Sequence, residues 1–256
     1  MKYIQWFRLC LFFGLAACHS EIEEEKLRLE IDFEQHWNNS PITPTTLNAY
    51  SFENAAGELL SIERLRYLIS DLSLGLKDGS QLILKAYHLI DIKSAESLRL
   101  SLETYVPLAD IQEVSFVFGL NRLANQDGVY PDLNAAVWNV PQALGGGYHF
   151  MQLDGKFKAQ PTAEAIAYNF HAIQAVDKTA GTALVFEDTF FKVSQQISPQ
   201  TADQDLTISM NLAEWFVNPH LWYLEKDNSM LMPNFEAQQR MADNGKSVFS
   251  IVVKKN

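Results

Sequence analysis

Short stretches in which apolar and polar residues alternate recur along most of the chain. Residues 27–33 place apolar side chains at every second position, between charged ones, which predicts a strand with one buried face. Further alternating or β-rich runs predict strands at residues 67–76, 81–92, 114–120, 148–153, 168–173, 184–193, 206–212 and 248–253. Turn signals separate these runs, and the pairs Asp78-Gly79 and Asp154-Gly155 are examples. The pattern predicts an all-β fold, an antiparallel β-sandwich with minor short helices.

The helical content is predicted to be small. Asn234 is a suitable N-cap for a segment with Phe235, Gln238 and Met241 spaced along it, and Gly245 is a suitable end. A second short helical turn is predicted at residues 212–216.

The N-terminus has the features of an export signal. Lys2 and Arg8 are followed by an apolar run that ends in small residues, and this run is too short to span a membrane. Residues 15–18, Leu-Ala-Ala-Cys, resemble the lipobox of bacterial lipoproteins. We therefore expect residues 1–17 to be a signal peptide and Cys18 to carry a lipid anchor in the cell envelope. The outer membrane is the expected site, and its periplasmic and surface faces both remain open.

Residues 18–26 are expected to form an acidic tether between the anchor and the folded chain. Four glutamates at positions 21, 23, 24 and 25 are compatible with an extended, solvated spacer. They also resemble the acidic tags that sort lipoproteins to the cell surface. No Gly-, Pro- or Ser-rich linker divides the remainder, so residues 27–256 are interpreted as one domain.

Composition excludes several functions. A net charge of −11 argues against a nucleic-acid partner, because phosphate binding requires clustered Lys and Arg. Cys10 would leave with the signal peptide and Cys18 would be acylated, so the mature domain would contain no thiol for catalysis or metal binding. The motifs of serine hydrolases, zinc peptidases and nucleotide-binding loops are missing from the sequence, and we predict that the protein is not an enzyme.

Several short motifs occur together in a particular order. The ordered segments are Phe33-Glu34-Gln35-His36, residues 50–57, 65–70 and 87–91, residues 114–121, Ala136-Val137-Trp138, residues 148–155, Phe170-His171 and residues 242–244. In this order the chain resembles the MbnP-like family, envelope proteins related to MbnP, MopE and CorA. The resemblance covers nearly the whole chain after the tether.

The resemblance implies copper binding without turnover. Some members of the family hold Cu(I) with two imidazoles and a kynurenine, which a di-haem enzyme of the MauG or cytochrome c peroxidase type forms from tryptophan. Imidazole suits soft Cu(I) where thiolate is absent. The resemblance favours His171, His36 and Trp138 as the site, with His149 and His88 as further candidate ligands. This chain departs from the family pattern, since Val140 replaces a second tryptophan and Ala172 replaces the residue expected after the histidine.

Two further hypotheses come from other segments. Residues 127–134 gather oxygen donors, so Asp127, Asp132 and Asn134 are candidate calcium ligands, although the same residue types are common in turns. The alternative function is a metal-free, surface-exposed module that binds a glycan or an envelope protein. Its candidate aromatic platform comprises Trp215, Phe216, Trp222 and Tyr223.

Overall fold

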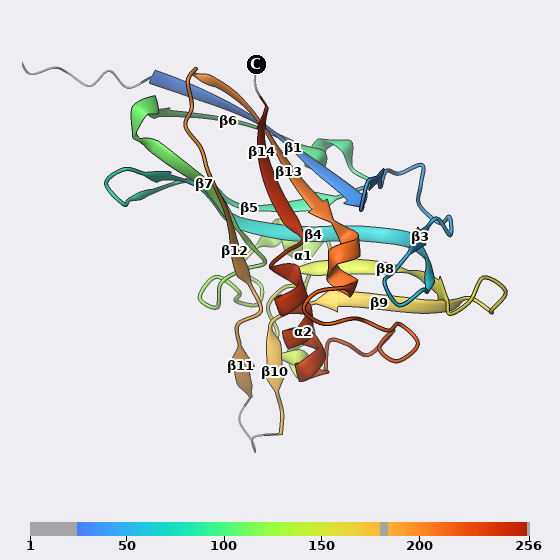
Figure 1. The fold of residues 1–256 in the computed structure, drawn as a ribbon. Coiled ribbons are helices and arrows are strands. Elements are labelled where there is room, and N and C mark those ends of the chain that lie inside the picture. The colour runs from blue at the N-terminus through green and yellow to red at the C-terminus, as the bar shows by residue number, and fades with distance from the viewer. Residues whose placement is uncertain (1–24, 180–183, 255–256) are drawn as a thin grey trace, which may run out of the picture.

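The computed structural model describes residues 25–179 and 184–254 (Figure 1). The predicted signal peptide, the candidate lipidation site Cys18 and residues 18–24 of the tether lie outside these ranges. No helix within the described ranges is both long enough and apolar enough to cross a membrane.

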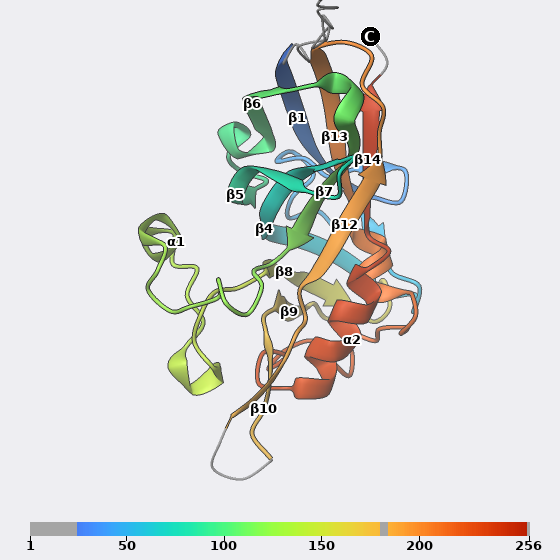
Figure 2. The ribbon, with the colours of Figure 1, turned by 90° about the vertical axis from the view of Figure 1, so that its left-hand side faces the viewer.

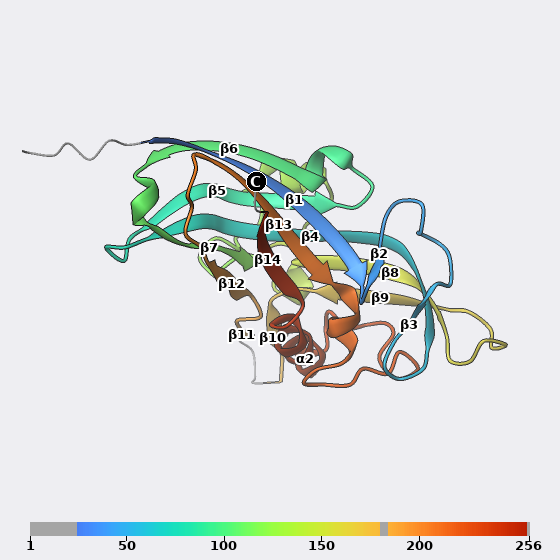
Figure 3. The same cartoon turned by 45° about the horizontal axis from the view of Figure 1, so that its top comes forward.

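One five-stranded sheet contains both ends of the described chain. Its strands follow the order β14-β13-β1-β2, with β6 also paired to β1. These strands are β1 (Glu25–Trp37), β2 (Ser40–Pro41), β6 (Arg99–Val106), β13 (Asp203–Asn211) and β14 (Phe249–Lys254). Figure 3 shows β1, β6 and β13 running along the same side of the molecule. The β1–β13 pair is parallel, whereas the other pairs of named strands are antiparallel, as the sequence predicts.

A second, seven-stranded sheet is organised around one long strand. Its strands are β3 (Phe52–Glu53), β4 (Leu59–Leu76), β5 (Gln81–Asp91), β7 (Ile111–Phe118), β8 (Met151–Lys158), β9 (Ile166–Ala172) and β12 (Phe191–Gln196). The first half of β4 pairs with β8 and its second half pairs with β7, while β9 and β12 extend the sheet beyond these two strands. β5 pairs with β4 across the hairpin predicted at Asp78-Gly79, where Gly79 adopts a positive φ.

The two sheets enclose a shared apolar core. On β1 the apolar positions of the alternating pattern, including Leu29 and Phe33, are buried. On β4 Leu65 and Tyr67 are buried, and the Tyr67 hydroxyl accepts a 3.0 Å hydrogen bond from Nε2 of Gln35 on β1. This contact between the sheets shows that Gln35 and Tyr67 face the core. Their neighbours along each strand point to the outer faces.

Short helical segments and one small hairpin complete the described chain. They are η1 (Ala95–Leu98), η2 (Leu108–Asp110), α1 (Pro131–Ala135), η3 (Gln142–Leu144), β10 (Ala175–Asp177), β11 (Val185–Glu187), η4 (Leu212–Phe216) and α2 (Phe235–Gly245). The predicted cap of α2 is confirmed, because the Asn234 side chain accepts a hydrogen bond from the Ala237 amide. Figure 2 shows α2 on one side of the molecule and the long β7–β8 connection, which carries α1, on the opposite side.

The all-β prediction is confirmed, with local differences. The strand predicted at residues 184–193 is interrupted, because β11 and β12 belong to different sheets. β6 was not predicted, although its residues alternate. Asp154-Gly155 is not a turn but lies within β8, where a Cβ on Gly155 would come within 2.0 Å of the Ser61 carbonyl oxygen on β4. Glycine is required there by a close approach of two strands.

Candidate functional site

The candidate site begins with polar side chains on the outer face of the seven-stranded sheet. Arg66 on β4 is in register with Gln152 on β8, and Gln152 is in register with His171 on β9. The next row of the same face pairs Arg64 with Asp154. Because β-strand residues alternate between faces, His171 points away from the core that its neighbour Phe170 contacts.

The β7–β8 connection adds two aromatic residues to this face. Its last segment folds back on itself, with an isolated bridge between Asn139 and Tyr148, and the His149 amide donates a 3.0 Å hydrogen bond to the Trp138 carbonyl. The ring centroids of Trp138 and His149 are 5.6 Å apart. This local hairpin brings together two residues that are eleven positions apart in the sequence.

His149 and His171 lie side by side. Their ring centroids are 5.4 Å apart, and the ring planes are at 82° to one another. Trp138, His149 and His171 therefore form one continuous group, in which His149 is central. The structure thus brings together three of the residues that the family resemblance suggests, with His149 in the place expected for His36.

Hydrogen bonds fix one nitrogen of each imidazole. Nδ1 of His149 lies 2.9 Å from the Trp138 carbonyl oxygen, which only accepts, so Nδ1–H is the donor. Nε2 of His171 lies 2.8 Å from Oδ1 of the Asp154 carboxylate and is likewise the donor. In each neutral ring the other nitrogen keeps its lone pair: Nε2 of His149 and Nδ1 of His171. Such second contacts are the usual way in which proteins orient histidine ligands.

Burial sets the charge state of His149, and hydrogen bonds set that of Asp154. Desolvation lowers the pKa of His149 to about 4, so this imidazole is neutral at neutral pH. Burial alone would raise the pKa of Asp154, but hydrogen bonds from His171, Arg64 and Asn169 more than compensate and hold that pKa far below its usual range. Asp154 is therefore an ionised acceptor. It also forms an ion pair with Arg64.

Two buried nitrogen atoms at the site have no hydrogen-bond partner. They are Nε1 of Trp138, whose side chain is fully buried, and Nε of Arg66. The Arg66 guanidinium lies over the Trp138 ring, with its central carbon 5.0 Å from the ring centroid. A buried donor without a hydrogen-bond partner lowers the stability of the fold, and such donors are often found at functional sites.

These observations test whether copper fits. His149 is neutral, and each of the two imidazoles has one ring nitrogen that is not used in a hydrogen bond, which suits Cu(I), an ion that accepts two or three soft ligands. No group of three or more His, Cys, Asp and Glu side chains spaced for a metal occurs within the described ranges. Two imidazole ligands match a low-coordinate soft ion, whereas zinc and calcium take four or more ligands.

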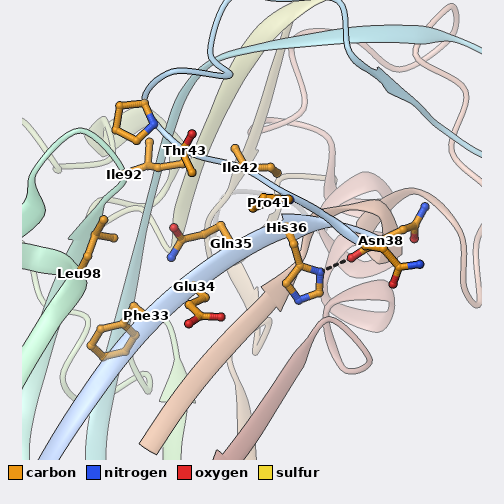
Figure 4. A pocket seen from close by; sticks show the side chains of 12 residues that line it. Phe33, Glu34, Gln35, His36, Asn38, Pro41, Ile42, Thr43, Ile92 and Leu98 are labelled. Carbon is orange, nitrogen blue, oxygen red and sulfur yellow. Dashed lines mark hydrogen bonds between the residues drawn. The ribbon is translucent and has the colours of Figure 1, made fainter.

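His36 lies elsewhere. It follows the core-facing Gln35 on β1 and so points to the outer face of the other sheet, across the sandwich from His171. Figure 4 shows its ring at the end of β1, where Nδ1 donates a 2.6 Å hydrogen bond to the Asn38 carbonyl. A cavity of about 450 Å³ adjoins it, lined also by Phe33, Ile42 and Ile92.

The other candidate histidine is also separate from the group. His88 lies on β5, where Nε2 is 2.9 Å from the Ser97 carbonyl and the ring packs against Phe33, and its burial lowers its pKa. It therefore has the contacts of a half-buried structural residue.

The candidate calcium loop uses its oxygens internally. Asp132 accepts a 2.7 Å hydrogen bond from the Tyr87 hydroxyl, and Asp127 accepts one of 2.5 Å from Gln142. Oδ1 of Asn134 accepts hydrogen bonds from Tyr148 and Asn139, each at 2.9 Å. These contacts hold the β7–β8 connection over the sheet, so the loop supports the neighbouring site structurally.

The candidate aromatic platform is mostly core. Trp215, Phe216 and Trp222 are fully buried, and Phe170 contacts all three. Tyr223 is the one member of this set with substantial exposure. A glycan could not stack on these rings without opening the core.

Sequence reasoning missed Arg66, Gln152 and Asp154. Residues 148–153 were predicted as a strand, and extending it by a few residues places Gln152 and Asp154 on the face opposite Leu153. The interpretation of Asp154-Gly155 as a turn concealed this. The position of Arg66 over Trp138 required the tertiary structure, since 72 positions separate the two residues in the sequence.

Comparison with known proteins identifies the family of the chain. The MbnP family profile matches residues 26–233, a range that includes Trp138, His149 and His171. The chain belongs to the MbnP family. The solved structure of MbnP from Methylosinus trichosporium aligns with a TM-score of 0.57 at 12% sequence identity, covering 90% of this chain and 100% of that one. At this identity the similarity shows a shared fold, and no curated protein matches the sequence. Family membership suggests a non-catalytic binding protein.

Proposed function

We propose that this protein is a lipid-anchored envelope protein that binds Cu(I) through His149 and His171, with Trp138 beside them, and catalyses no reaction. The observation that carries the proposal is the 5.4 Å contact between the two imidazoles, each oriented by a hydrogen bond through its other nitrogen. Membership of the MbnP family supports it, because the resemblance implies a copper site made of two imidazoles and a tryptophan-derived group.

The chain's own residues would prepare the site before any ion binds. Burial keeps His149 neutral, so its lone pair is available without loss of a proton. The Asp154 carboxylate orients His171 and makes its imidazole a better electron donor. The bound Cu(I) would be held for storage or for transfer to another protein.

A di-haem enzyme of the MauG or cytochrome c peroxidase type is the proposed partner for oxidation of Trp138. The indole is fully buried, so such a partner would act through the protein rather than by touching the ring. Val137, which precedes Trp138, is 77% exposed and has a φ of 55°, a strained conformation for a β-branched residue. The proposed approach of the partner is at this exposed apolar residue.

The experiment is a Cu(I) competition titration against a chromophoric chelator, with intact-mass analysis of the Trp138 peptide. His149→Ala and His171→Ala should each weaken Cu(I) binding at least a hundredfold. His36→Ala and His220→Ala are matched controls, because His36 lies across the sandwich and His220 contacts Asp243 instead. Wild-type protein that binds no Cu(I), or full binding by His149→Ala, would refute the site.

The alternative, a metal-free module for a glycan or envelope protein, receives less support. Three of the four residues of its proposed aromatic platform, Trp215, Phe216 and Trp222, are fully buried. Metal-free wild-type protein that binds a glycan array would favour this alternative.

A further inference from the structure

Arg66 is the one charged side chain that contacts the Trp138 ring among the described residues. Besides lying over the indole, it donates hydrogen bonds to Oε1 of Gln152 at 2.6 Å and to the Ala136 carbonyl at 3.2 Å. Gln152 links it in register to His171. Arg66 is thus held rigidly at the edge of the Trp138, His149 and His171 group.

Arg66 forms no ion pair with a carboxylate among the described residues, although Asp91, its register partner on β5, and Asp154 act on its charge from a longer distance. Arg64, two residues earlier on the same face of β4, forms an ion pair with Asp154, whereas no ion pair of Arg66 occurs within the described part of the chain. Its two acceptors are a neutral amide and a backbone carbonyl, and its buried Nε has no partner. A half-buried guanidinium without an ion pair is costly, so folding stability alone does not explain this arrangement.

We propose that Arg66 is the charge-selecting residue of the site: its guanidinium opposes any gain of positive charge at the bound metal and at the Trp138 indole. The part that concerns the metal rests on the proposed copper function, whereas the part that concerns the indole does not. Arg66 is a positioning residue in this scheme, since it acts through its field and through the ring it covers.

For the metal, the consequence is selection of a monovalent over a divalent ion. Arg66 and His171 are two strands apart, which is about 10 Å. At that distance, with an effective dielectric constant of about 20, a fixed positive charge lowers the binding affinity of a monovalent ion roughly tenfold and that of a divalent ion roughly a hundredfold. The residue therefore improves discrimination of Cu(I) from Zn(II) by roughly tenfold.

For the indole, the consequence is resistance to one-electron oxidation. When an indole loses one electron to an oxidant it becomes a radical cation, and a guanidinium over its face repels that product while being attracted to the neutral ring. Arg66 thus favours the intact tryptophan. An oxidising partner would have to overcome this preference.

The test compares Arg66→Met, which removes the charge but keeps much of the stem, with Arg66→Lys, which keeps the charge but loses the planar fork. Arg240→Met is the matched control, because its guanidinium lies 4.5 Å from the Trp222 ring, on the other side of the sheet. Dissociation constants for Cu(I) and Zn(II) are measured by chelator competition. The ratio of Zn(II) to Cu(I) affinity should rise roughly tenfold in Arg66→Met and stay near wild type in Arg66→Lys and Arg240→Met.

The metal-free readout uses hexachloroiridate(IV), which takes one electron from the indole and becomes iridium(III). Loss of the unmodified Trp138 peptide should be several-fold faster in Arg66→Met than in wild type or Arg66→Lys, with the Trp222 peptide as internal reference. A purely structural role would make Arg66→Lys behave like Arg66→Met, and that result overturns the proposal. Equal Trp138 oxidation rates in Arg66→Met and wild type also overturn it. If wild-type protein binds neither metal, the copper function fails, and the oxidation rates alone decide the role of Arg66.

Discussion

Nε2 of His171 donates a hydrogen bond to Oδ1 of Asp154, and this contact determines which imidazole nitrogen can bind a metal. Asp154 also receives hydrogen bonds from Arg64 and Asn169, so its carboxylate is held in place from three directions. The geometry is that of a ligand and its orienting carboxylate.

Asp154→Asn should weaken Cu(I) binding by about tenfold to a hundredfold, because a neutral amide orients His171 less firmly and makes it a poorer donor. Chelator competition measures the change. Asp227→Asn is a suitable control, since Asp227 is a similarly half-buried carboxylate that pairs with Arg240 instead. If Asp154→Asn binds Cu(I) as tightly as wild type, the carboxylate does not serve the site.

Cys18→Ser should release the protein from the membrane. The basis is the short apolar run that ends in Leu-Ala-Ala-Cys at residues 15–18. A single acyl chain holds a protein only marginally, whereas the several chains of a bacterial lipoprotein hold it firmly. Expression with a metabolic lipid label, followed by membrane fractionation, measures the effect. Unchanged labelling and fractionation of Cys18→Ser would show that the anchor is elsewhere.

Much of the sandwich could be predicted because alternation is a local signal. Residues 27–33 and 81–92 alternate because one side of each strand meets the core and the other meets solvent, and both became strands. The parallel pairing of β1 with β13 could not be predicted, since it joins segments 175 residues apart whose alternation would suit either direction. Strand direction depends on the connections between sheets rather than on local pattern.

The sequence predicts only part of the site, because the rest depends on contacts between distant segments. Trp138 and His171 could be found by the family resemblance, but the resemblance also favoured His36, which the sandwich places on the opposite outer face. The central role of His149 depends on the hairpin that joins Trp138 to His149, and no local sequence pattern specifies that hairpin. Arg66 and Asp154 contribute through register across β4, β8 and β9, which is a tertiary property.

Deleting residues 247–256 should abolish the native fold. The deletion removes β14, which pairs with β13 over six residues, and it removes Phe249, whose ring packs against Phe116 and Phe118 of the other sheet. The edge of β13 and part of the core would be exposed together. Circular dichroism and thermal melting measure the loss, and deletion of residues 255–256 alone, which leaves all of β14, is the control. A native-like melt of the longer deletion would show that β14 is dispensable.

The metal-free protein should lose stability as the pH falls from about 6.5 to about 4, and His149 should account for a large part of the loss. Burial lowers the pKa of His149 in the folded state to about 4, whereas the unfolded chain has an ordinary value of about 6.5. Between these values the unfolded state binds a proton that the folded state does not, so stability is full above the unfolded pKa and decreases on acidification. A difference of this size corresponds to about 3 kcal/mol. Urea unfolding at pH 7.5 and at pH 4.5 measures the decrease in wild type and in His149→Phe.

The comparison of the two proteins isolates His149 from other titrating groups. His88 also has a pKa lowered by burial and contributes a loss in the same direction, but it is present in both proteins. His149→Phe is expected to show a smaller decrease in unfolding free energy between the two pH values, because phenylalanine has no proton to gain. His36→Phe, which makes the same substitution on the opposite outer face and leaves His149 in place, is the matched control. Equal decreases in wild type and His149→Phe would mean that burial does not keep His149 neutral. Burial would then no longer explain why the lone pair of His149 is available to bind a metal.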